Sequence, residues 1–97
     1  MSNNIFASEE YRLLSWLADH QTKTNTELII KFSQSELAKE CGCSPSTINK
    51  RMQALQKAKC VEPYNKKGNY RITLTGEKVI SKMNSIEKLI GGNEDGK

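Results

Sequence analysis

The chain has 97 residues, of which 36% are hydrophobic and 27% charged, and a formal charge of +4. A chain of this length forms one small domain that buries about 60–65% of its unfolded surface. It lacks the ~20 consecutive apolar residues of a membrane span, and residues 1–10 lack the apolar run of a signal peptide. We therefore expect a single cytoplasmic domain over residues 1–97, with flexible tails at 1–7 and 92–97.

The basic residues are unevenly distributed along the chain. Residues 44–74 contain seven Lys or Arg and one acid, Glu62, which is a formal charge of +6 and leaves −2 for the rest. Charge concentrated in one stretch favours a polyanionic partner, because its field attracts phosphates. A membrane surface is disfavoured, since it would require an exposed apolar face beside the charges.

The N-terminal part predicts one helix and one strand. Ser8 is a predicted helix N-cap and is followed by two acids, which suit the first turn of a helix. Apolar residues then recur at helical spacing: Tyr11, Leu13, Leu14, Leu17 and Ala18. Trp16 lies at the edge of this stripe and is either a core residue, the default, or a subunit contact. Residues 21–26 are polar and aperiodic, which predicts a loop, and the β-rich residues 27–32 predict a short strand.

Residues 33–58 predict two helices joined by a tight turn. Ser33 and Glu36 have the spacing of a capping box at the first helix. Ser44 can cap the second helix, and the proline after it fits the first helical position. Between the helices Gly42 can adopt a positive φ, which lets the chain reverse direction. We interpret this stretch as a helix-turn-helix.

The second helix, residues 44–58, has two different faces. Ile48, Met52 and Leu55 share a narrow apolar arc that must face a core. The opposite face is polar and has no carboxylate, which suits the base edges and phosphates of a DNA major groove. The alternative is an ordinary solvated face, although such a face usually mixes both signs of charge. The predicted DNA contacts in the two helices are Ser35, Ser44, Ser46, Thr47, Asn49, Lys50, Gln53 and Lys57.

A basic hairpin follows the second helix. Residues 60–64 and 70–74 predict two strands, joined by a loop of about five residues with turn-forming composition. We predict that this hairpin is a basic wing, over residues 61–74, that binds DNA. The alternative is that its lysines only protect an exposed strand edge. The predicted DNA contacts of the wing are Lys66, Lys67, Asn69 and Arg71.

The last predicted helix begins with Thr75 as its N-cap and carries an apolar stripe. The stripe, at spacings of four, three and four, is Val79, Met83, Ile86 and Ile90, broadened by Ile80 and Leu89. We expect Val79 and Met83 to pack on the first helix. A helix of about 16 residues is roughly 24 Å long and outruns so small a core, so its last turns are predicted to form a homodimer contact. The residues predicted at this interface are Ile86, Leu89 and Ile90.

The cysteines and the single histidine do not predict a metal centre. Cys41, Cys43 and Cys60 are odd in number, which indicates reduced thiols. C-x-C is not the usual zinc spacing, and His20 lies a helix and a loop away, so we interpret the cysteines as small buried hydrophobes. A metal site and a redox sensor are the alternatives. We expect no cofactor and no small-molecule ligand, and no enzyme, because no nucleophile–base pair or phosphate-binding glycine loop is present.

The predicted order of helix, strand, helix, helix, hairpin and helix resembles a winged-helix domain. This is an α+β fold with three main helices, a hairpin wing with a short third strand, and a C-terminal helix. Residues 34–74 resemble the winged helix-turn-helix units of MarR- and GntR-type regulators and of plasmid replication, partition and transfer proteins. The matching residues are Leu37-Ala38, Gly42, Ser44-Pro45-Ser46-Thr47-Ile48, Met52, Leu55, Lys66-Lys67-Gly68 and Ile72-Thr73-Leu74-Thr75.

The resemblance implies that the second helix enters the major groove of double-stranded DNA while the wing touches the backbone or minor groove. Our leading hypothesis is a non-enzymatic, sequence-specific regulator of transcription. The homodimer predicted from the last helix would make its DNA target an inverted repeat. The alternatives are an accessory factor marking an origin, partition or transfer site of a mobile element, and a protein-interaction module. Lys59 stands where many such proteins have glycine, from which we expect a looser exit from the second helix. With no effector domain in the chain, small-molecule sensing is not expected.

Overall fold

The computed structural model describes residues 5–64 and 69–91. Of the predicted tails at 1–7 and 92–97, residues 1–4 and 92–97 lie outside the described residues, as do the wing lysines Lys66 and Lys67. The elements, in chain order, are α1 (Glu9–Asp19), β1 (Thr22–Lys23), β2 (Leu28–Ile29), α2 (Gln34–Cys41), α3 (Pro45–Lys57), β3 (Val61–Pro63), β4 (Tyr70–Ile72) and α4 (Leu74–Gly91). Four helices and two small antiparallel hairpins confirm the predicted α+β class.

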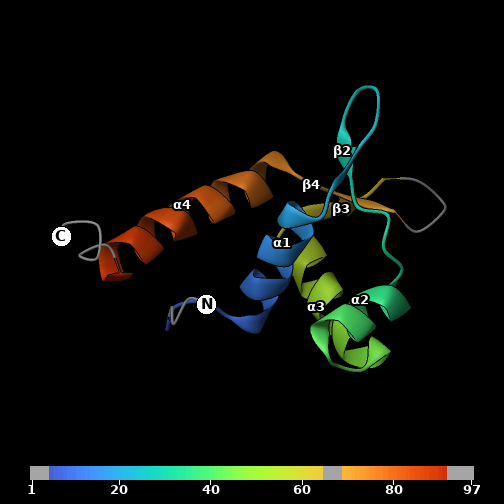
Figure 1. Cartoon of the computed structure of the whole chain (residues 1–97), viewed down its shortest axis with the longest axis horizontal. Helices are drawn as coiled ribbons and strands as arrows, with labels where there is room; N and C mark the ends of the chain where they lie inside the picture. Colours follow the sequence, from blue (N-terminus) through green and yellow to red (C-terminus); the bar gives the residue numbers. More distant parts are fainter. Residues whose placement is uncertain (1–4, 65–68, 92–97) are drawn as a thin grey trace.

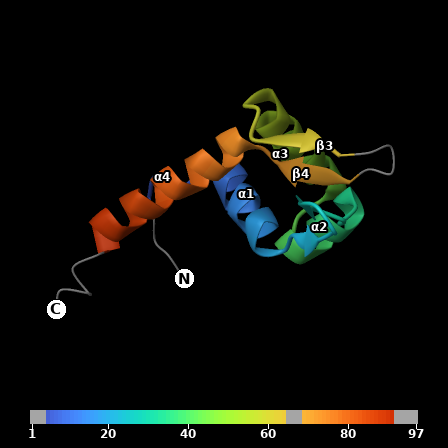
Figure 2. The same ribbon diagram turned by 90° about the horizontal axis from the view of Figure 1, so that it is seen from above.

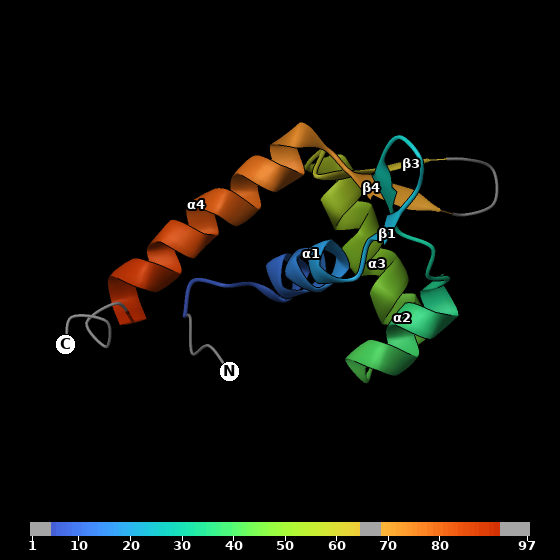
Figure 3. The same cartoon turned by 45° about the horizontal axis from the view of Figure 1, so that its top comes forward.

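Helices α1, α2 and α3 form the body of the domain (Figure 1). Strand β3 packs on α3, and β2 lies beside β4. The β1–β2 and β3–β4 hairpins are joined by a bridge between Ile30 and Tyr70, whose backbones exchange hydrogen bonds of 2.7 and 3.1 Å. Helix α4 leaves this sheet and runs away from the body, on the side opposite to the hairpin strands β3 and β4 (Figures 2 and 3).

One apolar core joins the helical body to the hairpins. Its largest fully buried side chains come from α1, α2, α3, β3 and the end of the β1–β2 hairpin: Leu14, Leu17, Ile30, Leu37, Ile48, Met52 and Val61. Leu14, Leu17, Ile48 and Met52 lie on helical apolar stripes that the sequence predicted, and full burial of a side chain of this size contributes about 1.5–3 kcal/mol. The core therefore holds α3 by its apolar face and leaves its polar face outward.

The predicted starts of the first two helices are confirmed by their hydrogen bonds. The Ser8 hydroxyl accepts the Tyr11 amide at 3.0 Å. In α2 the capping box is complete, because the Ser33 hydroxyl accepts the Glu36 amide and the Glu36 carboxylate accepts the Ser33 amide. Gly42 follows α2 with a φ of 69°, the left-handed conformation expected for the turn.

The strand prediction for residues 27–32 was partly wrong. Only Leu28–Ile29 forms a strand, and its partner is Thr22–Lys23, within the segment predicted as a loop. Thr24 closes the turn between them: its hydroxyl accepts the Glu27 amide at 3.0 Å and donates to the Glu27 carbonyl at 2.9 Å. Strands of two residues are too short to show an alternating pattern, so the sequence could not reveal the pairing.

The start and inner face of α4 also differ from the prediction. Thr73, and not Thr75, caps the helix, since its hydroxyl accepts the Gly76 amide at 3.0 Å. Ile80 packs on the core with Met83, whereas Val79 remains 36% exposed. The cause is Gly76: a Cβ there would lie 2.3 Å from the Cys60 carbonyl oxygen. The helix therefore packs against the Cys60 backbone through Gly76, and the face that contains Gly76, Ile80 and Met83 points toward the core.

Candidate nucleic-acid interface

Helix α3 presents the polar face that its sequence predicted. Ile48 and Met52 are fully buried, and the sequence of α3 contains no carboxylate. The predicted contacts on the outer face are all exposed: Ser46, Asn49, Lys50, Gln53 and Lys57. The two faces of the helix are thus separated as a DNA-reading helix requires.

Hydroxyl groups cluster at the N-terminus of α3. Ser44 caps the helix by accepting the Thr47 amide at 3.2 Å, and its hydroxyl lies 3.0 Å from that of Thr47 and 3.2 Å from that of Ser46. Ser44 is therefore committed to the helix end, and Thr47 is half-buried beside it. Ser35 lies exposed in the first turn of α2. The hydroxyls of Ser44, Ser46 and Thr47 lie at the N-terminus of α3, where the backbone dipole favours an anion such as a phosphate.

The longer polar side chains of α3 remain available to a partner molecule. Within residues 5–64 and 69–91, the side chains of Asn49, Lys50 and Gln53 take no part in a hydrogen bond or ion pair. Arg51 behaves differently, because it faces α1 and lies 3.9 Å from the Glu9 carboxylate with 25% of its side chain exposed. One of the seven bases counted in the basic stretch is thus turned toward the domain.

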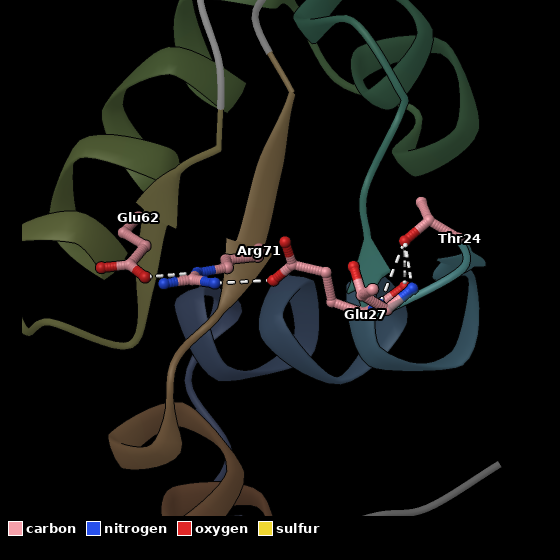
Figure 4. Close-up of polar contacts among 5 residues, drawn as sticks. Thr24, Glu27, Glu62 and Arg71 are labelled. Atoms are coloured by element: carbon pink, nitrogen blue, oxygen red, sulfur yellow. Dashed lines mark hydrogen bonds and ion pairs between the residues drawn. The ribbon is translucent and has the colours of Figure 1, made fainter.

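Arg71 is not a free cation. It lies directly opposite Glu62 in the β3–β4 ladder, and its Nε donates to the Glu62 carboxylate. Its Nη1 donates to Oε1 of Glu27 at 2.7 Å (Figure 4). Hydrogen bonds with Glu62 and then Glu27 raise the pKa of Arg71 above its ordinary value. Sequence reasoning missed Glu27, which is 44 residues from Arg71 and has no local pattern that marks it.

Asn69 closes the base of the wing loop. Its carbonyl accepts the Tyr64 amide at 2.8 Å, and the residue is half-buried. With Lys66 and Lys67 outside the described residues, the described part of the predicted wing contains the paired Glu62 and Arg71. The net positive charge of residues 61–74 therefore comes from Lys66 and Lys67.

The residues predicted at the dimer interface lie on the projecting part of α4. Ile86 is half-buried, Leu89 is 83% exposed and Ile90 is 45% exposed. Trp16, for which a core and a subunit role were both open, stacks on the His20 ring at a centroid distance of 3.8 Å and meets Phe32 edge to face. It is part of an aromatic cluster within the chain.

The cysteines show no metal-binding arrangement. Cys60 is buried, whereas Cys41 and Cys43 are half-buried, so the prediction of burial holds fully for Cys60 alone. Burial raises the pKa of the Cys60 thiol and is the main cause of the raised pKa of Cys41. Within the described part of the chain, no three His, Cys, Asp or Glu residues are placed to hold a metal ion.

These elements make up a winged helix-turn-helix domain with an exposed polar face on α3. The chain belongs to the Crp-like helix-turn-helix domain family, whose model matches residues 11–81. Domains of this family bind DNA. The match supports the predicted superfamily and does not confirm the resemblance to MarR- or GntR-type regulators or to plasmid proteins.

A solved structure shares this fold. The reduced (Fe(II)) CO-sensing protein from R. rubrum superposes with a TM-score of 0.61 and is 21% identical in sequence. The match covers 75% of this chain and 36% of that protein, so the chain spans about a third of its length. No curated protein matches the chain in sequence. Among the residues that the structure describes, no helix is long and apolar enough to cross a membrane.

Proposed function

We propose that this protein is a cytoplasmic, sequence-specific DNA-binding regulator of transcription. Residues 44–58 enter the major groove, and the wing at 61–74 contacts the flanking backbone. The observation that supports this most is the outer face of α3, which is exposed, polar and free of acids while Ile48 and Met52 anchor the opposite face. The match to the Crp-like helix-turn-helix domain family supports a DNA-binding role for that face.

The side chains on this face have complementary chemistry for DNA. Asn49 and Gln53 carry amides of the kind that pair with adenine in the major groove, and Lys50 can donate to guanine. Ser35, Ser46 and the end of the helix favour phosphates, which position the helix but do not read the sequence. Lys57 lies at the far end of α3 and extends the positive face toward the wing.

Replacing Asn49 by alanine tests the role of the helix. We expect Asn49→Ala to weaken binding to the preferred site by about 1–3 kcal/mol and to relax sequence preference at one or two positions. The site is first selected from a random DNA pool, and affinities are then measured by fluorescence anisotropy on selected and random duplexes. Asn84→Ala is the matched control, because Asn84 is exposed on α4. Unchanged affinity for the selected site contradicts base readout by Asn49, and equal losses on both duplexes indicate a phosphate contact.

We propose further that two copies bind an inverted repeat. Exposed Leu89 and Ile90, with Ile86 beside them, support a contact between the α4 helices of two subunits. A two-fold dimer would place two copies of α3 on half-sites about one helical turn of DNA apart. Mapping the selected site relative to promoters separates a regulator of transcription from a protein that marks an origin or a transfer site.

A further inference from the structure

The ion cluster of Glu27, Glu62 and Arg71 links the two hairpins of the domain (Figure 4). Arg71 is on β4, Glu62 is opposite it on β3, and Glu27 is at the start of the strand segment in the other hairpin. The guanidinium uses Nε for Glu62 and Nη1 for Glu27, so one planar group binds two carboxylates in two directions. The bond to Glu27 joins β4 to the β1–β2 hairpin, and Glu27 also forms a hydrogen bond with the Tyr64 side chain, which raises the pKa of Tyr64.

The backbone holds both ends of this contact in place. Thr24 fixes Glu27 through hydrogen bonds with its amide and its carbonyl. Tyr70, next to Arg71, exchanges backbone hydrogen bonds with Ile30. Apart from this bridge, the paired strands of each hairpin are only two or three residues long. Ladders this short are marginal by themselves, so the side-chain contact adds to the alignment that the buried side chains of Ile30, Val61 and Ile72 give the hairpins.

We propose that Arg71 is a positioning residue that sets the angle of the wing by binding Glu27 and Glu62 together, and that it makes no phosphate contact itself. This inference rests on the proposed DNA-binding function. One guanidinium and two carboxylates carry a net charge of −1, which repels a phosphate. The bonds to Glu62 and Glu27 use Nε and Nη1, so a phosphate that approached Nη2 would meet both carboxylates beside it. The phosphate-binding charge of the wing is then supplied by Lys66 and Lys67, and Arg71 determines where their loop meets the DNA.

A positioning role and a phosphate contact predict opposite effects of Glu27→Gln. If Arg71 bound a phosphate, removing a competing carboxylate would release the arginine and tighten DNA binding. If Arg71 aligns the hairpins, the same substitution breaks the alignment and weakens binding although it removes a negative charge. Arg71→Lys separates the two roles as well, because lysine keeps the charge but lacks the rigid fork that holds two carboxylates.

The first experiment measures affinity for the selected site at about 0.15 M salt. We expect Glu27→Gln, Arg71→Lys and Arg71→Gln each to weaken binding by about tenfold. A loss of this size corresponds to losing most of the phosphate contacts proposed for Lys66 and Lys67. Glu62→Gln breaks a bond within one hairpin and should cost less. Lys82→Gln, on exposed α4, is the control for loss of one positive charge. Parental affinity for Arg71→Lys together with tighter binding by Glu27→Gln overturns the proposal.

The second experiment measures coupling between Arg71 and the wing lysines, which a general loss of stability would not change. Arg71→Gln should cost less than twofold in a protein that already carries Lys66→Ala and Lys67→Ala, because the misplaced loop has no contacts left to lose. Circular dichroism confirms that every variant is folded at the temperature of measurement. If Arg71→Gln weakens DNA binding by the same factor in the Lys66→Ala, Lys67→Ala protein as in the parent, the positioning role is overturned.

Amide hydrogen exchange tests the cluster without DNA. Arg71→Gln should speed exchange at the Ile30 and Tyr70 amides, which form the bridge between the hairpins, while the Met52 amide in the core keeps its parental rate. Unchanged exchange at the bridge overturns the proposal. If the parent protein binds no DNA of any sequence, the proposed function fails, and this experiment still decides whether the cluster aligns the hairpins.

Discussion

Lys59 adopts a left-handed backbone conformation that lysine disfavours. It has a φ of 64° and is the one non-glycine residue with positive φ in the described part of the chain. Its amide donates to the Gln56 carbonyl, and the Cys60 amide donates to the Leu55 carbonyl, both at 2.9 Å. These are the paired bonds of a Schellman motif at the end of α3. The expectation of a looser exit was wrong, because the two bonds hold lysine in the conformation usual for glycine.

We expect Lys59→Gly to raise the free energy of unfolding. A left-handed residue other than glycine costs roughly 1–2 kcal/mol, part of which the greater freedom of glycine in the unfolded chain offsets. The net gain should be about 0.5–1 kcal/mol in urea denaturation. Lys78→Gly, at an exposed position inside α4, is the control and should cost about 1 kcal/mol. Equal destabilisation by both substitutions would contradict the strain at Lys59.

At the scale of elements, the packing of α4 on the body depends on Gly76, to which the sequence analysis assigned no role. Gly76 is buried where α4 crosses the chain at Cys60. An added Cβ would also lie 2.8 Å from Cγ2 of Ile72. The carbonyl of Cys60 accepts the Thr73 amide at 3.0 Å, so the backbone that the Cβ would meet is itself held in place.

We expect Gly76→Ala to destabilise the protein by about 1–3 kcal/mol, because α4 must move away from the Cys60 backbone. Helix propensity alone predicts the opposite, a gain of up to ~1 kcal/mol for alanine. The sign in urea denaturation therefore separates packing from propensity. Asn84→Ala in the same helix serves as the control and should be neutral or slightly stabilising. A stabilised Gly76→Ala variant would show that α4 is not held against Cys60.

The wing can be tested as an element through its two loop lysines. Replacing Lys66 and Lys67 by alanine should reduce the slope of log affinity against log salt by roughly 2, if each lysine meets one phosphate. Affinities for the selected site are measured across a salt series. Lys78→Ala with Lys82→Ala, both exposed on α4, removes the same charge away from the proposed interface. A parental slope in the wing variant would remove the loop from the DNA contact.

At the scale of the whole molecule, α4 makes the domain elongated. The radius of gyration is 14.3 Å, above the ~13 Å expected of a compact chain of about 100 residues. At 18 residues, α4 is about 27 Å long. The body covers Gly76, Ile80 and Met83 near its start, and the helix then continues past α1 with Leu89 and Ile90 exposed. An apolar helix end of this kind is where a second copy would bury most surface.

We predict a dimer at tens of micromolar in sedimentation equilibrium and a monomer after Ile86→Asp with Ile90→Asp. The acids put unpaired charge into the proposed contact, which is costly when buried. Ser81→Asp with Ser85→Asp adds the same charge at exposed positions of α4 and should leave the dimer intact. Thermal unfolding checks that both variants remain folded. A monomeric parent that occupies its DNA site singly would end the dimer proposal.

The sequence by itself determined the helix-turn-helix and its orientation. The caps at Ser8, Ser33 and Ser44, the left-handed Gly42, and the burial of Ile48 and Met52 were all predicted from it. Each of these features depends on contacts within about four residues or on the helical repeat, and both can be recognised in the amino-acid sequence. The wing hairpin could be predicted for the same reason, because residues typical of a turn separate its two strands.

Only the tertiary structure decided how the hairpins and α4 are placed. Arg71 was predicted to contact DNA, and the sequence did not reveal its ion-pair partner Glu27, which is distant in the chain and carries no motif. The start of α4 and its inner face depend on Gly76 meeting the Cys60 backbone, a contact between separate elements. The first hairpin has strands too short for any periodicity. Long-range ion pairs, close backbone approaches and very short strands leave no pattern within a single window of sequence, so they appear only once the chain has folded.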